Sequence, residues 1–187
     1  MRRFLITASL LLLFTAPASA QTVKAHGVEL PTQAELGGEQ LTLNGAGLRK
    51  KFMFKVYVGS LYLQEKTSDA DQVLNMEDPN RVRMDLLRDV DQDTLNEAMA
   101  EGLQANLTDA EREQFSAEIA QFNGMLDDGK KGDQVFIDYV PGEGIRITHD
   151  GRDKGTIAND DFHRPLLKLW IGPNPSDKNL KQGMLGG

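Results

Sequence analysis

Three aspartates at every second position, Asp89, Asp91 and Asp93, have the spacing that opens a calcium-binding loop. Such a loop also needs Gly at its sixth position and Glu at its twelfth, where this chain has Thr94 and Ala100. Carboxylates placed before a helix instead stabilise the positive end of its dipole. The pattern therefore predicts helix caps, with Asp91 or Asp93 as the cap itself.

The other residue types that often carry chemistry show no matching pattern. The chain has no Cys, which excludes disulfides, thiolate metal sites and cysteine nucleophiles. Gly45-Ala46-Gly47 starts like a nucleotide-binding fingerprint, but Lys50 stands where the third Gly belongs. The chain also lacks the Gly-x-Ser-x-Gly elbow of many serine hydrolases. The three histidines are scattered, without the pairing of a metal site: His26, His149 and His163. We expect no metal and no cofactor from these spacings.

Charge argues against nucleic acid as a partner. The 187 residues include 21 basic and 28 acidic side chains, for a formal net charge of −7. Proteins that bind DNA or RNA usually carry a basic stripe, because release of counterions from phosphates drives the binding. Here the basic clusters are short, Arg49-Lys50-Lys51 and Lys130-Lys131.

The first twenty residues have the three parts of a secretory signal. Arg2 and Arg3 precede an apolar run, Phe4–Phe14, and Ala18-Ser19-Ala20 matches the pattern that signal peptidase cuts. The alternative is a membrane anchor or buried helix, which Pro17 and the polar residues after Ala20 disfavour. The sequence predicts cleavage after Ala20, a periplasmic location, and a single domain over residues 21–187. No later stretch approaches the roughly 20 apolar residues of a transmembrane helix.

Alternating apolar residues predict strands in two parts of the chain. The stretch from Leu41 to Leu63 is typical of two strands around a Gly turn. From Val56 onward both faces of the second strand are apolar, so we expect cover on both sides. Residues 81–86 alternate cleanly, which predicts a strand with one wet face. Residues 134–149 predict a hairpin with its turn at Pro141–Gly144, and a short strand follows at residues 155–158.

Helical periodicity appears between and after these strands. A short helix is expected after Ser68 as its N-cap. Thr108 and Glu111 form a capping box for a helix whose apolar stripe runs from Phe115 to Leu126, after an earlier helix with Leu95 in its stripe. Two terminal helices are expected at residues 160–170 and 176–185. Strands, a helical block, strands and helices in this order predict an α+β fold.

Three segments together resemble the chalcone isomerase-like family, specifically its exported bacterial branch. The first runs from Leu43 through Gly45-Ala46-Gly47 and Arg49 to Leu63. The others are Asp138–Gly142 and Leu166–Gly172, the latter followed by Pro175 and Leu180-Lys181. The resemblance covers roughly residues 30–185. It implies an open-faced β-sandwich, a large antiparallel sheet with a layer of helices on one face.

The resemblance also allows the plant isomerase's catalytic positions to be compared with this chain. Its arginine falls on Arg49 and is retained. Its first threonine falls on Tyr57 and its second on Leu169, so both hydroxyls are replaced. Its helical tyrosine and asparagine fall within residues 94–103, where there is no Tyr and Asn96 is out of register. One of five positions survives, so we expect no isomerase chemistry and predict no catalytic residue.

Fatty-acid-binding relatives hold the lipid carboxylate with an arginine and a tyrosine, which Arg49 and Tyr57 would reproduce. The resulting hypothesis is an exported, non-catalytic binding protein for a small amphipathic carboxylate such as a fatty acid. Tyr57 is expected on the strand face opposite Phe54, Val56 and Val58. The alternatives are a purely structural role for the pair, an isomerase or intramolecular lyase, a haem protein with His163 or His149 as ligand, and a protein-binding module.

Overall fold

The computed structural model describes residues 21–187, and the predicted signal peptide lies outside them. The strands are β1 (Thr22–Ala25), β2 (Val28–Pro31), β3 (Gln33–Leu36), β4 (Glu39–Lys51), β5 (Phe54–Leu63), β6 (Asn80–Leu86), β7 (Gln134–Val140), β8 (Gly144–His149) and β9 (Arg152–Ile157). The helices are α1 (Ala70–Leu74), α2 (Gln92–Asn106), α3 (Asp109–Gln114), α4 (Ser116–Met125), the 3₁₀ turn η1 (Asp160–Phe162), α5 (His163–Ile171) and α6 (Lys178–Met184).

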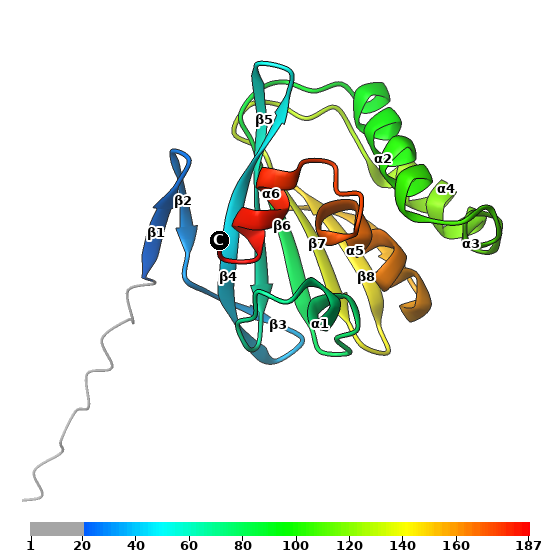
Figure 1. Ribbon diagram of the computed structural model, residues 1–187, viewed down its shortest axis with the longest axis horizontal. Coiled ribbons are helices and arrows are strands. Elements are labelled where there is room, and N and C mark those ends of the chain that lie inside the picture. Colours follow the sequence, from blue (N-terminus) through cyan, green and yellow to red (C-terminus); the bar gives the residue numbers. More distant parts are fainter. Residues whose placement is uncertain (1–20) are drawn as a thin grey trace, which may run out of the picture.

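A curled seven-stranded antiparallel sheet forms the body, and its strands follow chain order from β3 to β9. The helices lie on one side of this sheet, and β1 and β2 form a separate ribbon beside β4 (Figure 1). This arrangement confirms the predicted α+β fold and its one-sided helical layer. No helix among residues 21–187 is long and apolar enough to cross a membrane.

The sheet buries side chains on both faces, as the apolar pattern of β5 predicted. Leu61 and Leu63 point to the helical side, where they join the main core with Trp170 of α5. Val58 and Tyr62 point to the opposite side, into a smaller apolar cluster that Leu30 of β2 completes. The ribbon is tied down there, because the Tyr62 hydroxyl donates to the Pro31 carbonyl oxygen over 3.0 Å.

The turn between β4 and β5 lies elsewhere than the sequence suggested. It is formed by Phe52 and Met53, while Gly45 and Gly47 lie inside β4. A Cβ on Gly47 would lie 2.3 Å from the Leu180 carbonyl oxygen, and one on Gly45 would lie 2.2 Å from that of Gly183. These glycines therefore allow α6 to pack directly on the strand rather than allowing the chain to turn.

The wet face predicted for β6 is wrong. Arg83 and Asp85 are only 6% exposed, and they form a bidentate ion pair with N–O distances of 2.8 and 2.6 Å. Arg81 makes a second bidentate pair, with Asp138 of β7. Alternation of polar and apolar residues normally marks a solvated face, but here the polar side chains form ion pairs within the protein instead of contacting water.

Several smaller expectations can also be compared with the structure. Asp91 caps α2 and the Thr108–Glu111 capping box begins α3, as predicted. The N-cap of α1 is Asp69 rather than Ser68, and Phe115 divides the expected single helix into α3 and α4. The hairpin of β7 and β8 is confirmed. Strands β1 to β3 were not predicted, because their apolar residues are few.

Candidate functional site

The stem of the β4–β5 hairpin brings Arg49 and Tyr57 together. They are directly opposed partners across the two strands, so their side chains share a face of the sheet. The register shifts next to this pair, because Lys50 pairs with Lys55 and leaves Val56 as an extra residue. Bulges of this kind re-aim side chains. Phe54 and Val56 consequently line the same cavity as Tyr57, which corrects the expectation that they would face away from it.

The segment before α6 completes the polar end of this cavity. Asp177 caps α6 by accepting from the backbone N–H groups of Asn179 and Leu180, and it also accepts from the Lys50 N–H over 3.0 Å. Arg49 Nη1 donates to the Ser176 carbonyl oxygen over 2.5 Å. The close packing of α6 on the β4 glycines therefore sets the position of the groups that surround Arg49.

The cavity has a volume of about 260 Å³ and lies between the sheet and the helices α2 and α5. Its deep wall is buried and almost wholly apolar, and its outer rim carries charged side chains. The apolar lining comprises Phe52, Phe54, Val56, Met84, Leu86, Val90, Leu95, Ala98, Met99, Leu169 and Trp170. The polar lining comprises Arg49, Lys51, Tyr57, Arg88, Asp89, Asp91, Thr94 and Ser176.

Tyr57 is buried and stays protonated. Its hydroxyl oxygen accepts from the indole N–H of Trp170 over 3.1 Å, which leaves the hydroxyl proton free to donate. Burial raises the pKa of the phenol, and the nearby Arg49 charge opposes that rise only in part. The Ser176 side chain, also on this wall, lies beside the phenol and likewise lowers its pKa, although no hydrogen bond of regular geometry joins the two hydroxyls.

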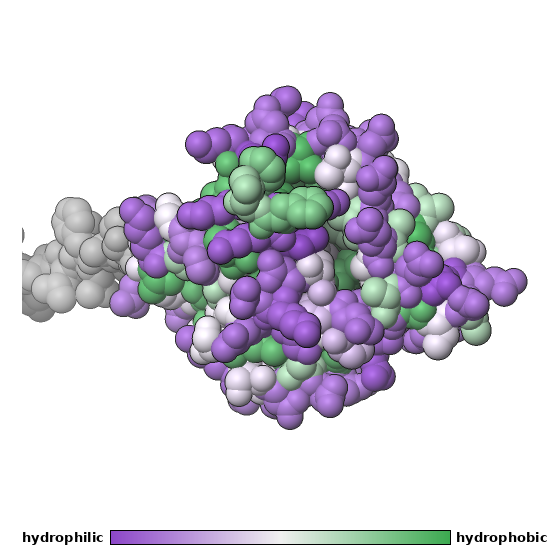
Figure 2. Space-filling view, turned by 45° about the horizontal axis from the view of Figure 1, so that its top comes forward, coloured by the Kyte–Doolittle hydropathy of each residue, from purple (hydrophilic) through white to green (hydrophobic). Residues whose placement is uncertain are grey.

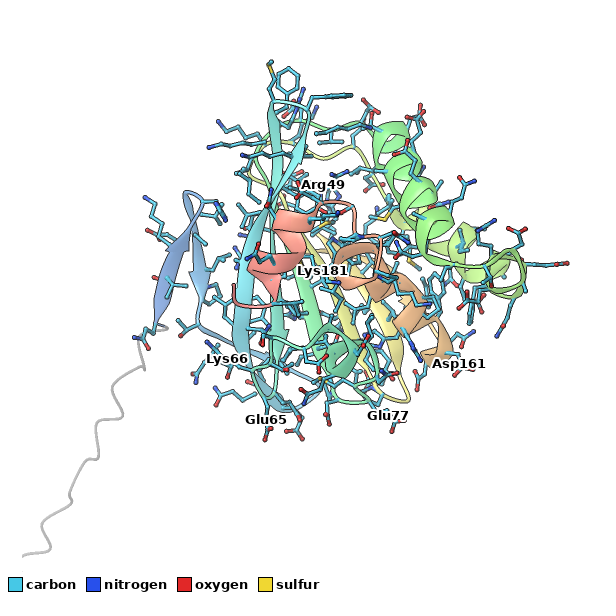
Figure 3. All side chains as sticks on the ribbon, in the orientation of Figure 1. Arg49, Glu65, Lys66, Glu77, Asp161 and Lys181 are labelled. Atoms are coloured by element: carbon cyan, nitrogen blue, oxygen red, sulfur yellow. The ribbon has the colours of Figure 1, made fainter. Side chains whose placement is uncertain are left out.

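Arg49 is half-buried and has no carboxylate partner in the described part of the chain. Its Nη1 donates to the carbonyl oxygens of Lys50 and Ser176, while Nη2 and Nε have no acceptor among residues 21–187. Figure 3 shows the side chain between the hairpin stem and α6, on the helical side. A guanidinium with unused donors beside a neutral phenol offers a matched site for a carboxylate.

The remaining sequence candidates lie elsewhere. His163 Nε2 donates to Asn80 Oδ1 over 3.0 Å, and its ring stacks on Tyr139 at 3.8 Å. His149 Nε2 lies 3.1 Å from Asp133 Oδ2. Neither histidine lines the cavity beside Arg49, so nothing here supports a haem ligand. Residues 21–187 contain no cluster of side chains suited to a metal ion.

Sequence reasoning missed two groups at the polar end of the site. Trp170 and Ser176 lie more than a hundred residues from Arg49, and only the packing of α5 and α6 brings them to it. The motif containing Trp170 had contributed to the family resemblance but had no assigned role. Leu169 does line the cavity, as its alignment with a plant catalytic position implied, whereas Asn96 does not.

The curled sheet, its one-sided helical layer and the cavity between them define an open-faced β-sandwich. A family model described as chalcone isomerase-like matches residues 22–186, so the chain belongs to the chalcone isomerase-like family. The crystal structure of a fatty-acid binding protein of Arabidopsis thaliana is similar, with a TM-score of 0.67 and 16% sequence identity. The match covers 88% of this chain and 96% of that one, and it confirms the fold. No curated protein sequence matches this chain.

Proposed function

We propose that the protein binds a small amphipathic carboxylate such as a fatty acid, without transforming it. The observation that carries this proposal is the pairing of Arg49 with Tyr57 at the polar end of an otherwise apolar cavity. Two donor nitrogens of Arg49, Nη2 and Nε, and the hydroxyl proton of Tyr57 are available to a ligand. The similarity to a fatty-acid binding protein supports a binding role of this kind.

The wall of the cavity suits an acyl chain. Met84, Leu86 and Met99 form its buried side, and burial of each methylene there contributes about 0.8 kcal/mol. The volume of about 260 Å³ lies just below the roughly 300–1,000 Å³ typical of small-molecule sites. A ligand of modest chain length therefore fits best, with its carboxylate at Arg49.

The same lining disfavours the isomerase alternative. Acyl and ketone chemistry needs donors arranged around the developing oxyanion, and a lone arginine does not supply that network. Leu169 occupies one position where the plant enzyme has a hydroxyl, and Asn96 lies outside the cavity. The proposal includes export: a signal peptide at residues 1–20, cleavage after Ala20, and one periplasmic domain over residues 21–187.

The protein supplies its own reporter for a binding experiment. Trp170 is the single tryptophan, and it lies buried in the cavity wall against Tyr57. Titration with saturated fatty acids of increasing chain length is expected to change its fluorescence, with calorimetry giving the dissociation constant. Arg49→Gln removes a charged donor, which is expected to weaken binding by about 10- to 100-fold.

The matched control is Arg164→Gln, which removes an exposed arginine of α5 outside the cavity. It is expected to leave affinity unchanged. Equal affinity in the Arg49→Gln protein would refute the carboxylate clamp. Organic extraction of freshly purified protein, followed by mass spectrometry, tests the same idea independently, because a bound fatty acid should be present in the unaltered protein and absent from the Arg49→Gln protein.

A further inference from the structure

The apex of the β4–β5 hairpin exposes three large apolar side chains in succession. Phe52 is 91% exposed, Met53 84% and Phe54 54%. Apolar surface of this kind, gathered at one point, marks an interaction site rather than ordinary surface composition. Figure 2, which brings this end of the molecule forward, shows an apolar projection with hydrophilic surface around it.

The backbone conformation at this apex is one that a phenylalanine rarely adopts. Phe52 has a φ of 55°, in the left-handed region where Gly or Asn is favoured and a bulky side chain is strained. Neither folding nor solubility would select a phenylalanine at the tip of a two-residue turn. We take the residue as selected for what its exposed ring contacts.

Basic side chains surround the apolar tip. Lys50, Lys51 and Lys55 flank it along the hairpin, and the Arg88 guanidinium lies 4.8 Å from the centre of the Phe54 ring. Two carboxylates near this end are already bound: Asp89 by the Lys130 ammonium and the Lys131 N–H, and Asp177 by backbone N–H groups that include that of Lys50. This end is therefore locally positive in a chain whose net charge is −7.

The tip is continuous with the mouth of the cavity. Phe52, Phe54 and Lys51 line its outer part, and Arg49 and Tyr57 lie further down the same two strands. Apolar side chains ringed by lysine and arginine have the chemistry of a membrane-surface anchor, in which the rings enter the acyl boundary and the cations meet anionic headgroups. Three residues fall short of the roughly 20–30 that each side of a stable protein interface contributes.

We propose that the β4–β5 tip (Lys50–Lys55) docks on an anionic lipid bilayer and turns the mouth of the cavity toward the membrane surface. The purpose that we assign to docking, exchange of the ligand between the bilayer and the cavity, rests on the proposed function of binding an amphipathic carboxylate. The tip itself is defined by its exposure and charge alone.

Flotation with vesicles tests this proposal on the purified protein. It is expected to bind vesicles of phosphatidylcholine mixed with phosphatidylglycerol, to bind phosphatidylcholine alone much less, and to dissociate at high salt. Lys50→Glu combined with Lys55→Glu should lower the apparent affinity by at least about 30-fold, since each cation near an anionic surface contributes separately. Met53→Asp should abolish binding by placing a charge at the apex.

Two controls match these changes at other places. Lys66→Glu reverses an exposed lysine at the far end of the sheet, at the lower left of the domain in Figure 3, and Val23→Asp alters an exposed valine of β1. Both are expected to bind vesicles like the unaltered protein. Weakening by the controls as strong as that by the tip variants would overturn the proposal, as would absence of binding to anionic vesicles.

Phe52→Asn separates docking from folding. Asn tolerates the left-handed backbone, so the substitution is expected to keep or raise the melting temperature while it weakens vesicle binding. Unchanged vesicle binding in this variant would contradict the proposal that the tip is the docking site. Lys50, Met53 and Lys55 do not line the cavity, so their variants should bind free fatty acid normally. Vesicle binding without fatty-acid binding would refute the proposed function alone, and the reverse result would refute docking alone.

Discussion

The two faces of the sheet use arginine in opposite ways. On the face away from the helices, Arg81 and Arg83 are each held by a carboxylate through two hydrogen bonds. On the helical face, Arg49 contacts only carbonyl oxygens within residues 21–187. The charges of Arg81 and Arg83 are balanced by carboxylates inside the fold. The charge of Arg49 has no carboxylate partner within residues 21–187, and its unused donors lie beside a cavity.

Three other buried titratable side chains on the helical face are neutral near pH 7. Burial raises the pKa values of Tyr57 and Tyr139, so both phenols stay neutral. Burial also lowers the pKa of His163 to about 4, so this imidazole is neutral near pH 7. The difference gives a way to separate a structural arginine from a functional one. Removing the carboxylate partner of a structural arginine should lower the stability of the protein, whereas removing a functional arginine should lower its affinity for the ligand.

The largest effect is expected from Asp85→Ala. The substitution leaves the Arg83 guanidinium buried without its carboxylate, and breaking a buried pair in this way costs about 3–5 kcal/mol. Urea unfolding measures the change in free energy. Arg49→Gln serves as the comparison and should change the free energy of unfolding by less than about 1 kcal/mol. Similar losses in the two proteins would remove the distinction between the faces.

Acid should destabilise the helical face through His163. The imidazole is neutral in the folded protein and ionises near pH 6.5 when unfolded, so the unfolded state binds more protons below that value. Stability should therefore fall as the pH drops from about 6.5 to about 4, by roughly 3 kcal/mol. Unfolding of His163→Gln over the same range isolates this contribution, because its carboxylates are unchanged. Parallel pH profiles for the two proteins would refute it.

The sequence was sufficient for the fold and for naming two residues that lie together beside the cavity, whose role stays a prediction. Arg49 and Tyr57 stood in motifs whose family resemblance implied a role, and the apolar pattern of β5 predicted burial on both faces. The sequence was insufficient where a segment far away in the chain determines the local structure. Gly47 was interpreted as part of a turn, because nothing nearby in the chain reveals that α6 rests on it.

Period-two patterns were misleading for a related reason. Alternation in residues 81–86 is the same whether the polar face meets water or an internal ion pair, so the burial of Arg83 could not be inferred. The bulge at Val56 likewise has no sequence mark, yet it decides that Phe54 lines the cavity with Tyr57. Both features depend on neighbouring strands rather than on the residues themselves.

Gly47→Ala tests whether the helical face depends on this close packing. Its Cβ would meet the Leu180 carbonyl oxygen, and overpacking of this kind costs about 1–3 kcal/mol. Displacement of α6 should also move Ser176 away from Arg49, so fatty-acid affinity should fall together with the melting temperature. Gly124→Ala, in a helix position with open space around it, is the control; it should leave fatty-acid affinity unchanged and keep or slightly raise the melting temperature, because Ala is the better helix former.

The smallest effect is expected from Tyr57→Phe, which keeps the ring and removes the hydroxyl. A ligand carboxylate would lose one neutral donor, worth about 1 kcal/mol or roughly fivefold in affinity. The Trp170 indole N–H would lose its acceptor, so a similar loss of stability is expected, together with altered tryptophan fluorescence. Since Arg49 keeps its charge in this variant, binding should weaken far less than in Arg49→Gln. Weakening as large as that of Arg49→Gln would mean that the phenol, rather than the unpaired guanidinium, dominates recognition on the helical face.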